Sequence, residues 1–199
     1  MRKWLPLVLV TSCVLSALSC RQATKPTTAG DNAILALALT HKFDDGGHTV
    51  VSPETGTGMT GVADPEDLAQ LKRYATQKLQ LPGVDVGKLI DDFAAKNRKS
   101  VRLTLASAPE KGYLIDFNGE YAKYFGKDGG GGWDAWYKDH PKAHGQTTVS
   151  LPAWDRASGT VLLYMGTQSH WLAGAGFLIA YKYDGTTLRE IKRVMMWIS

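Results

Sequence analysis

Residues 160–183 read TVLLYMGTQSHWLAGAGFLIAYKY, and this stretch decides the fold class of the chain. It is rich in Val, Ile, Leu, Thr and aromatic residues, the types that are enriched in β-strands. Successive side chains of a strand point to opposite faces, and in 171–183 neither face is polar. The sequence therefore predicts long strands in a sheet that is covered on both sides.

Other segments of the C-terminal half have a composition similar to that of this stretch. Asp184-Gly185, directly after it, is a tight hairpin signal. We expect an antiparallel sheet of about four strands, over 147–151, 159–168, 171–183 and 188–199.

Helix signals dominate the N-terminal half, apart from a short predicted strand at 48–52. Asp64-Pro65-Glu66-Asp67 combines an N-cap residue, a proline at the first helical position and acids near the helix start. Apolar spacing predicts helices over 64–79 and 85–97, and we expect shorter ones over 120–125 and 133–140. Residues 32–42 fit a helix or a buried strand, and the helix is favoured because Ala and Leu are better helix formers than strand formers. The expected fold is α+β, with N-terminal helices packed on a C-terminal antiparallel sheet.

The first 20 residues have the pattern of a secretory signal. Arg2 and Lys3 precede the uncharged stretch 4–20, which contains Pro6 and is shorter than the about 20 apolar residues of a membrane-spanning helix. Residues 17–20, Ala-Leu-Ser-Cys, resemble the lipobox of bacterial lipoproteins, in which the cysteine becomes the lipid-modified first residue. The lipobox places its leucine one position earlier, and a plain cleavage site after Ala17 is the alternative.

These signals divide the chain into three parts. We predict a signal peptide over 1–19, a lipid anchor at Cys20 with a flexible tether over 20–31, and one α+β domain over 32–199. A domain of this size can bury a hydrophobic core of its own.

Charge and cysteine content exclude several classes of function. The chain has 23 Lys and Arg against 19 Asp and Glu, and loss of Arg2 and Lys3 leaves a small positive excess without a dense basic patch. We therefore expect no nucleic-acid partner. If Cys20 is acylated, the remaining domain has no thiol for a disulfide or a redox site.

No catalytic or metal-binding motif stands out. His140 and His144 have the spacing of a zinc-binding helix, but Pro141 interrupts them and no glutamate accompanies them, so a surface loop is favoured. We expect no metal and no cofactor. A catalytic set, for example from Asp116, Glu120, His140 or His144, would form only if the fold brings such residues together.

The C-terminal part of the chain resembles an uncharacterised group of secreted bacterial proteins. The matching features are GWDAWYKDHP at 132–141, LAGAG at 172–176 and the ending WIS at 197–199. In that group a GW-x-x-[FW]-Y-x-x-[HY]-P segment precedes a sheet with a glycine-rich strand and a terminal Trp-[IV]-Ser. The resemblance implies the fold and export, and it implies no catalytic residues.

Aromatic residues of the last third are the strongest sign of a binding surface. Three of them share one face of the helix predicted over 133–140, and two glycines leave the strand at 171–183 with a strip free of side chains. Packing inside the domain is the simpler explanation of both features, and a ligand surface is the sharper one. The expected ligand-binding residues are Trp133, Trp136, Tyr137, Trp154, Trp171, Gly174 and Gly176.

Two functions fit the sequence. The first is a non-enzymatic binding or interaction domain of the bacterial cell envelope, tethered to the membrane through Cys20, with a glycan, peptide or protein partner. The second is an envelope hydrolase. An enzyme would need titratable groups with shifted pKa values that converge in a pocket, and a binding domain would not.

Overall fold

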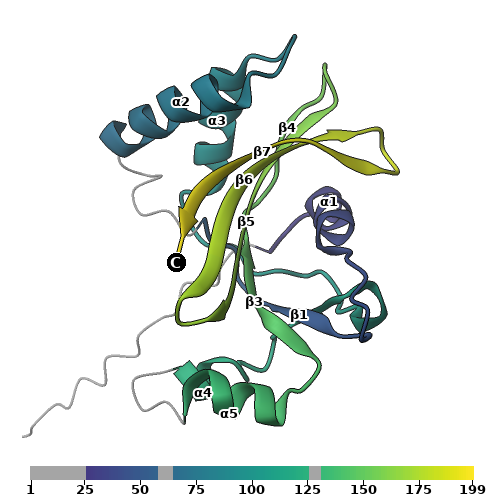
Figure 1. Ribbon diagram of the computed structural model, residues 1–199. Helices are drawn as coiled ribbons and strands as arrows, with labels where there is room; N and C mark the ends of the chain where they lie inside the picture. Colours follow the sequence, from purple (N-terminus) through teal and green to yellow (C-terminus); the bar gives the residue numbers. More distant parts are fainter. Residues whose placement is uncertain (1–25, 58–64, 126–130) are drawn as a thin grey trace, which may run out of the picture.

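The computed structural model describes residues 26–57, 65–125 and 131–199. A seven-stranded sheet crosses the molecule, with helices on both of its sides (Figure 1). The strands are β1 (His48–Val51), β2 (Tyr113–Ile115), β3 (Ala143–Val149), β4 (Ala153–Asp155), β5 (Thr160–His170), β6 (Ala173–Tyr183) and β7 (Leu188–Ile198). The helices are α1 (Ala29–Leu39), α2 (Pro65–Leu79), α3 (Val86–Lys96), α4 (Ala122–Phe125) and α5 (Gly132–Asp139), with a 3-10 turn η1 (Pro109–Lys111).

The predicted antiparallel strands form the larger part of the sheet. β3, β5, β6 and β7 are neighbours in that order, and each pair is antiparallel. The side chain of Asp184 accepts hydrogen bonds from the backbone of Thr186 and Thr187 and closes the turn between β6 and β7. Gly185 has a φ of 102° there, a conformation that glycine adopts without strain. The hairpin prediction is confirmed.

The predicted order of helices before sheet is wrong, and so is the number of strands. β1 and β2 precede the predicted strands in the chain and extend the sheet by parallel pairing, β1 with β3 and β2 with β1. α4 and α5 lie between β2 and β3 in the chain. Parallel strands must be joined by long connections. The sequence therefore contains no short turn that would indicate which strands pair with β1 and β2.

Helices cover both faces of the long strands, as the apolar character of β6 predicts. On one face α2 and α3 pack against the sheet through residues such as Phe93, which contributes to the same core as Leu162 and Leu178. On the other face α1 contributes Leu35 to a core with Leu163 and Ile179. β5 and β6 therefore serve two cores at once.

α4 and α5 form a separate aromatic unit at the end of the sheet where β1 and β3 lie (Figure 1). Trp133 and Trp136 are its buried centre, together with Val50 of β1 and Ala143 of β3. Two rings of the α4 segment, those of Tyr121 and Phe125, pack against them.

The first helix begins earlier than predicted. The side chain of Thr28 accepts a hydrogen bond from the backbone of Asp31, and the carboxylate of Asp31 accepts one from the backbone of Thr28, so α1 starts at Ala29 with a capping box. Thr27, which falls in the segment predicted as a flexible tether, is buried. The signal peptide and Cys20 lie outside the described residues. Within the described residues, no helix has the length and apolar character needed to cross a membrane.

Candidate functional site

The aromatic face of α5 faces inward. Trp133 is 2% exposed and Trp136 is 1% exposed. The ring centroid of Phe125 lies 4.6 Å from that of Trp133, and the ring of Tyr121 meets Trp136 edge-on at 5.5 Å. Packing thus accounts for these two tryptophans, and the exposed stacking platform expected from their spacing is absent in this conformation.

Two further predicted residues connect α5 to the turn between β5 and β6. The hydroxyl of Tyr137 donates a hydrogen bond to the carbonyl of Ser169 at 2.7 Å. Trp171 packs edge-on against Phe125 with centroids 5.8 Å apart, but it remains 59% exposed, and Leu172 beside it is 84% exposed. This turn is the most exposed apolar point among the described residues.

The glycine strip of β6 is not an open ligand floor. The indole of Trp197 on β7 lies directly over Gly176, and a Cβ at that position would overlap the indole nitrogen. Gly174 is covered in part by the same ring, which would lie 3.1 Å from a Cβ at position 174. On the opposite face of β6, Gly174 borders a shallow groove of about 500 Å³ together with Phe177 and Ile198.

Trp154 lies in another part of the molecule. The guanidinium carbon of Arg156 lies 4.0 Å from the centroid of its ring, a cation–π contact. Both residues line a groove of about 630 Å³ that also borders Pro26 and Lys96. The structure therefore distributes the predicted ligand-binding residues over three separate places instead of collecting them at one.

A cavity of about 420 Å³ lies where β1 and β2 meet the α4–α5 unit. Its volume falls in the about 300–1,000 Å³ range of small-molecule sites. The polar residues in its lining are His48, Ser107, Asp116, Asn118, Glu120 and His140. Trp136 and Phe117 supply aromatic surface. Because polar groups from three chain segments converge here, we take this cavity as the candidate functional site.

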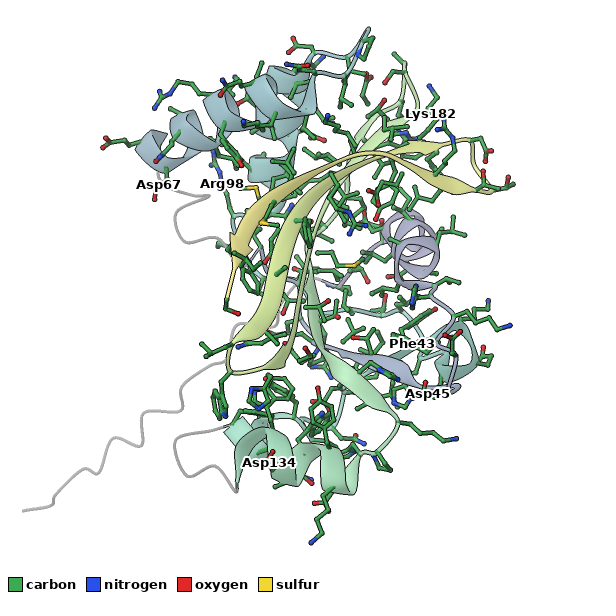
Figure 2. All side chains as sticks on the ribbon, in the orientation of Figure 1. Phe43, Asp45, Asp67, Arg98, Asp134 and Lys182 are labelled. Atoms are coloured by element: carbon green, nitrogen blue, oxygen red, sulfur yellow. The ribbon has the colours of Figure 1, made fainter. Side chains whose placement is uncertain are left out.

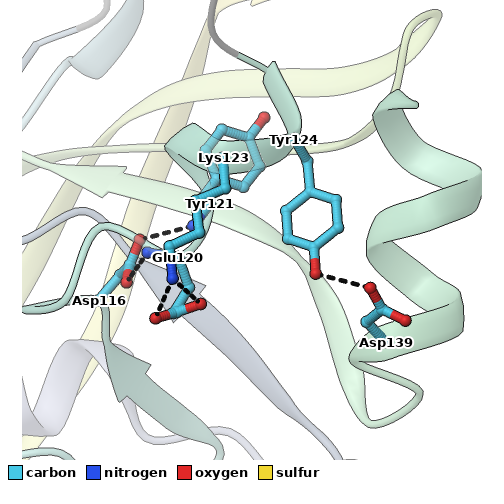
Figure 3. A network of polar contacts seen from close by, with 6 residues as sticks. All are labelled: Asp116, Glu120, Tyr121, Lys123, Tyr124 and Asp139. Carbon is cyan, nitrogen blue, oxygen red and sulfur yellow. Dashed lines mark hydrogen bonds and ion pairs between the residues drawn. The ribbon is translucent and has the colours of Figure 1, made fainter. Parts of the chain in front are cut away.

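Asp116 lines the cavity, and its carboxylate holds a turn of the backbone (Figure 3). It is 5% exposed, and its carboxylate oxygens accept hydrogen bonds from the backbone nitrogens of Glu120 at 2.8 Å and Tyr121 at 3.0 Å. These bonds hold the turn that leads from β2 into α4. A buried carboxylate with two N–H donors has the partners that its charge requires.

Glu120 also has a partner of its own. Both of its carboxylate oxygens lie 2.8 Å from the ammonium nitrogen of Lys123, one turn further along (Figure 3). Nearby, the hydroxyl of Tyr124 donates to the carboxylate of Asp139 at 2.8 Å and links α4 to α5. Each of the two carboxylates in the cavity lining is thus engaged by groups of its own segment.

The two histidines of the cavity are in a different state. The imidazole of His140 stacks on Trp136, with ring centroids 4.0 Å apart. Burial lowers the pKa of His48 below its ordinary value of 6.5, and the nearby His144, His140 and Lys142 lower it further. His48 is therefore neutral at pH 7. In the described chain neither imidazole has a side-chain hydrogen bond or a carboxylate partner.

Three of the four residues considered for a catalytic set, Asp116, Glu120 and His140, do meet at this cavity. His144 does not line it; its Nε2 lies 2.9 Å from both carboxylate oxygens of Asp45. The sequence analysis missed His48 and Asn118. His48 begins β1 and Asn118 follows β2, so they come from separate segments that meet only in the folded protein.

The described residues contain no group of three or more His, Cys, Asp or Glu side chains placed to hold a metal ion. No protein-family model matches the sequence, and no curated protein or solved structure matches it significantly. The arguments that follow therefore rest on the cavity itself. It can donate and accept hydrogen bonds around a small polar ligand, with aromatic surface at its wall and rim.

Proposed function

We propose that the protein is a non-enzymatic binding domain of the bacterial cell envelope that takes a small polar envelope ligand, a saccharide or a short peptide, into the cavity beside His48 and His140. The signal pattern at the N-terminus supports export, and Cys20 is the proposed point of lipid attachment. The cavity supports ligand binding by its volume and its convergent polar lining.

The observation that carries the proposal is that both carboxylates of the cavity already have partners. Asp116 holds two backbone N–H groups, and Glu120 is paired with Lys123. General acid–base catalysis needs groups that are free to exchange a proton with a substrate. The occupied acids favour recognition over turnover, and the side chains of His48, His140 and Asn118, which have no side-chain hydrogen-bond partner in the described chain, are available to hydrogen-bond to a ligand.

A ligand screen with matched variants tests this function. The protein from Ala23 onward is screened by thermal shift against muropeptides, oligosaccharides and envelope peptides, and ligands that shift the melting temperature are measured by calorimetry. Asn118→Ala should weaken binding, because Asn118 lines the cavity and is exposed, so its loss leaves the core intact. Arg156→Ala, in the separate groove beside Trp154, is the control and should bind as the wild type does. Equal weakening of ligand binding in both variants would argue against this cavity as the binding site.

The tether is tested separately in the full-length chain. Cys20→Ser should shift the protein from the detergent phase to the aqueous phase in phase partition, and Cys13→Ser should not, because Cys13 lies inside the predicted signal peptide. If wild type and Cys20→Ser partition identically, Cys20 is not a lipid anchor, and export by a cleaved signal peptide remains as the proposal.

The alternative hydrolase is favoured by one observation, the presence of Asp116, Glu120 and His140 in a single cavity. Mass spectrometry of each binding ligand after prolonged incubation distinguishes the two functions. Unchanged ligand supports the binding domain. Cleavage that is lost in Glu120→Gln and retained in Asn118→Ala would establish the enzyme.

A further inference from the structure

The turn between β5 and β6 exposes two large apolar side chains next to each other. Trp171 is 59% exposed and Leu172 is 84% exposed. Ile198, at the end of β7, is 71% exposed, and it lies at the same end of the sheet because it pairs with Ala175, three residues after Leu172. Single exposed apolar residues are common, but several at one end of a molecule mark a surface that contacts a partner. We call Trp171, Leu172 and Ile198 the apolar tip.

The chain around the apolar tip carries little charge. Residues 157–181 and 194–199 contain no Asp, Glu, Lys or Arg, and the imidazole of His170 is the one ionisable side chain of the turn itself. Among the described residues that line the shallow groove beside the tip, Arg193 alone has a charged side chain, and it is paired with Glu190 at 2.6 Å. Such a surface can enter an apolar phase without the cost of moving an unpaired charge out of water.

Several backbone groups of the turn have hydrogen-bond partners within the protein. The hydroxyl of Tyr137 donates to the carbonyl of Ser169, and the hydroxyl of Ser169 donates to the carbonyl of Ala173 at 3.1 Å. The side-chain amide of Gln168 donates to the carbonyl of His170 at 3.3 Å. Water can satisfy the carbonyls of a solvated turn, but lipid offers no such partner, so groups in contact with lipid must be satisfied internally. Three carbonyls of this turn meet that requirement.

Trp171 is held in its exposed position. Its ring packs edge-on against Phe125 of α4, and a Cβ at position 132 would lie only 2.9 Å from its indole. Figure 1 shows the turn beside α4. A side chain that is already oriented loses little entropy when a partner covers it. Tryptophan is also enriched at membrane interfaces, where its ring meets apolar groups and its N–H stays with polar ones.

The proposed lipid anchor keeps the domain close to a bilayer. Only five residues separate Cys20 from Pro26, the first described residue. At about 3.6 Å per residue, the chain from Cys20 to Pro26 spans at most about 22 Å. A domain of this length has an expected radius of gyration of about 16 Å, so it is wider than the tether is long. A chain that is lipidated at Cys20 therefore has its domain against the bilayer surface.

We propose that the apolar tip inserts into the interface of this bilayer, with Leu172 toward the acyl chains and Trp171 at the level of the headgroups. The inference rests on the lipid anchor of the proposed function, and it adds the surface by which the domain lies on the membrane. Because the anchor already holds the domain at the bilayer, a weak affinity of the tip for lipid is sufficient. The two contacts together fix the orientation of the domain.

Quenching of tryptophan fluorescence by lipid tests the contact. The full-length chain is expressed in bacteria and reconstituted in vesicles of phosphatidylethanolamine and phosphatidylglycerol, with or without brominated acyl chains that quench the tryptophans they touch. We expect brominated lipid to quench the wild type, and Trp171→Phe to lose most of this quenching. Trp154→Phe is the matched control, because it removes a tryptophan from a separate groove, and it should keep the quenching. Equal quenching in the two variants would overturn the insertion.

Leu172 provides a second comparison. Leu172→Gln should reduce the quenching at least twofold, and because this side chain is 84% exposed, its replacement leaves the core intact. Leu37→Gln changes a partly exposed leucine of α1 and should leave the quenching unchanged. Absence of quenching in the wild type would overturn the proposal. A dimer that Leu172→Gln converts to a monomer in analytical ultracentrifugation would also overturn it, in favour of a second copy of the chain as the partner.

The outcome can be separated from that of the proposed function. The apolar tip does not line the cavity, so Trp171→Phe and Leu172→Gln should bind cavity ligands as the wild type does. Equal quenching in all variants together with intact ligand binding would overturn the insertion alone. Quenching that depends on Trp171 without any ligand binding would overturn the cavity alone. Identical phase partition of wild type and Cys20→Ser would remove the anchor and this inference with it.

Discussion

The indole N–H of Trp197 on β7 donates a hydrogen bond to the hydroxyl oxygen of Tyr164 on β5, at 2.7 Å across the intervening strand β6. The bond is possible because the residue between them on β6 is Gly176, whose missing side chain leaves room for the indole. The glycine-rich strand of this chain is therefore one half of an internal contact, and the tryptophan of the C-terminal Trp-Ile-Ser is the other half.

A side chain at position 176 should destabilise the fold. Gly176→Ala places a Cβ against the Trp197 indole, and overpacking of this kind lowers the free energy of unfolding by about 1–3 kcal/mol. Gly30→Ala is the control, because a Cβ in α1 would meet only the Thr28 hydroxyl at an ordinary 3.9 Å. Urea unfolding should show a loss in the first variant and none in the second, and equal stabilities would refute the contact's importance.

Loss of the hydroxyl that receives the bond should also be costly. Tyr164→Phe leaves the Trp197 N–H without its acceptor in a partly buried place, which costs about 1–3 kcal/mol of unfolding free energy. Tyr183→Phe removes a hydroxyl that donates to the Gly185 carbonyl on the exposed hairpin, and it should cost less than about 0.5 kcal/mol. The ranking of the two variants in urea unfolding checks the prediction, and a reversed ranking contradicts it.

The long strands and several helix ends could be predicted because their signals are local. The helix predicted over 85–97 is α3, which Asp85 caps through a hydrogen bond from the backbone of Lys88. Asp184-Gly185 turns the chain within four residues. In both cases the interacting groups are sequence neighbours, so their pattern is visible without knowledge of the fold.

The rest depended on contacts between distant segments. The spacing of Trp133 and Trp136 shows that they share a helix face, but it cannot show whether that face meets the solvent or Val50 of β1. The strip at Gly176 is equally compatible with a ligand and with Trp197. The cavity collects His48 with residues from two other segments, and no spacing in a single sequence carries that information.

Alkaline pH should destabilise the fold through two tyrosines. Burial is the main cause that raises the pKa of Tyr121 and that of Tyr181 to about 12, from an ordinary value of 10.0. Between these values the unfolded chain loses the phenolic protons first, so the free energy of unfolding falls as the pH rises from 10 to 12. Tyr181→Phe should flatten this decline in urea unfolding measured at pH 9, 10 and 11. An unchanged slope would show that Tyr181 titrates normally.

The loop that leads into β1 offers a last test, because it holds the backbone directly before His48. Asp45 holds this loop, because its carboxylate accepts a hydrogen bond from the backbone of Gly47 at 2.9 Å and lies against His144. The imidazole of His144 also stacks on Phe43, with ring centroids 4.3 Å apart, and Figure 2 places Phe43 and Asp45 together beside β1. Phe43, Asp45 and His144 thus fix the backbone directly before the cavity.

The Gly47 hydrogen bond, followed by His144, lowers the pKa of Asp45 below its ordinary 3.8. Stabilisation of the loop by this carboxylate is therefore complete above pH 4 and is lost as the pH falls through the lowered pKa. Asp45→Ala should speed hydrogen exchange of the Gly47 amide at pH 6 and weaken ligand binding at the cavity, since the backbone before His48 is no longer held. Asp44→Ala, its exposed neighbour, should change neither quantity. If the two variants exchange at the same rate, Asp45 does not hold the loop, and His48 must be positioned by the pairing of β1 alone.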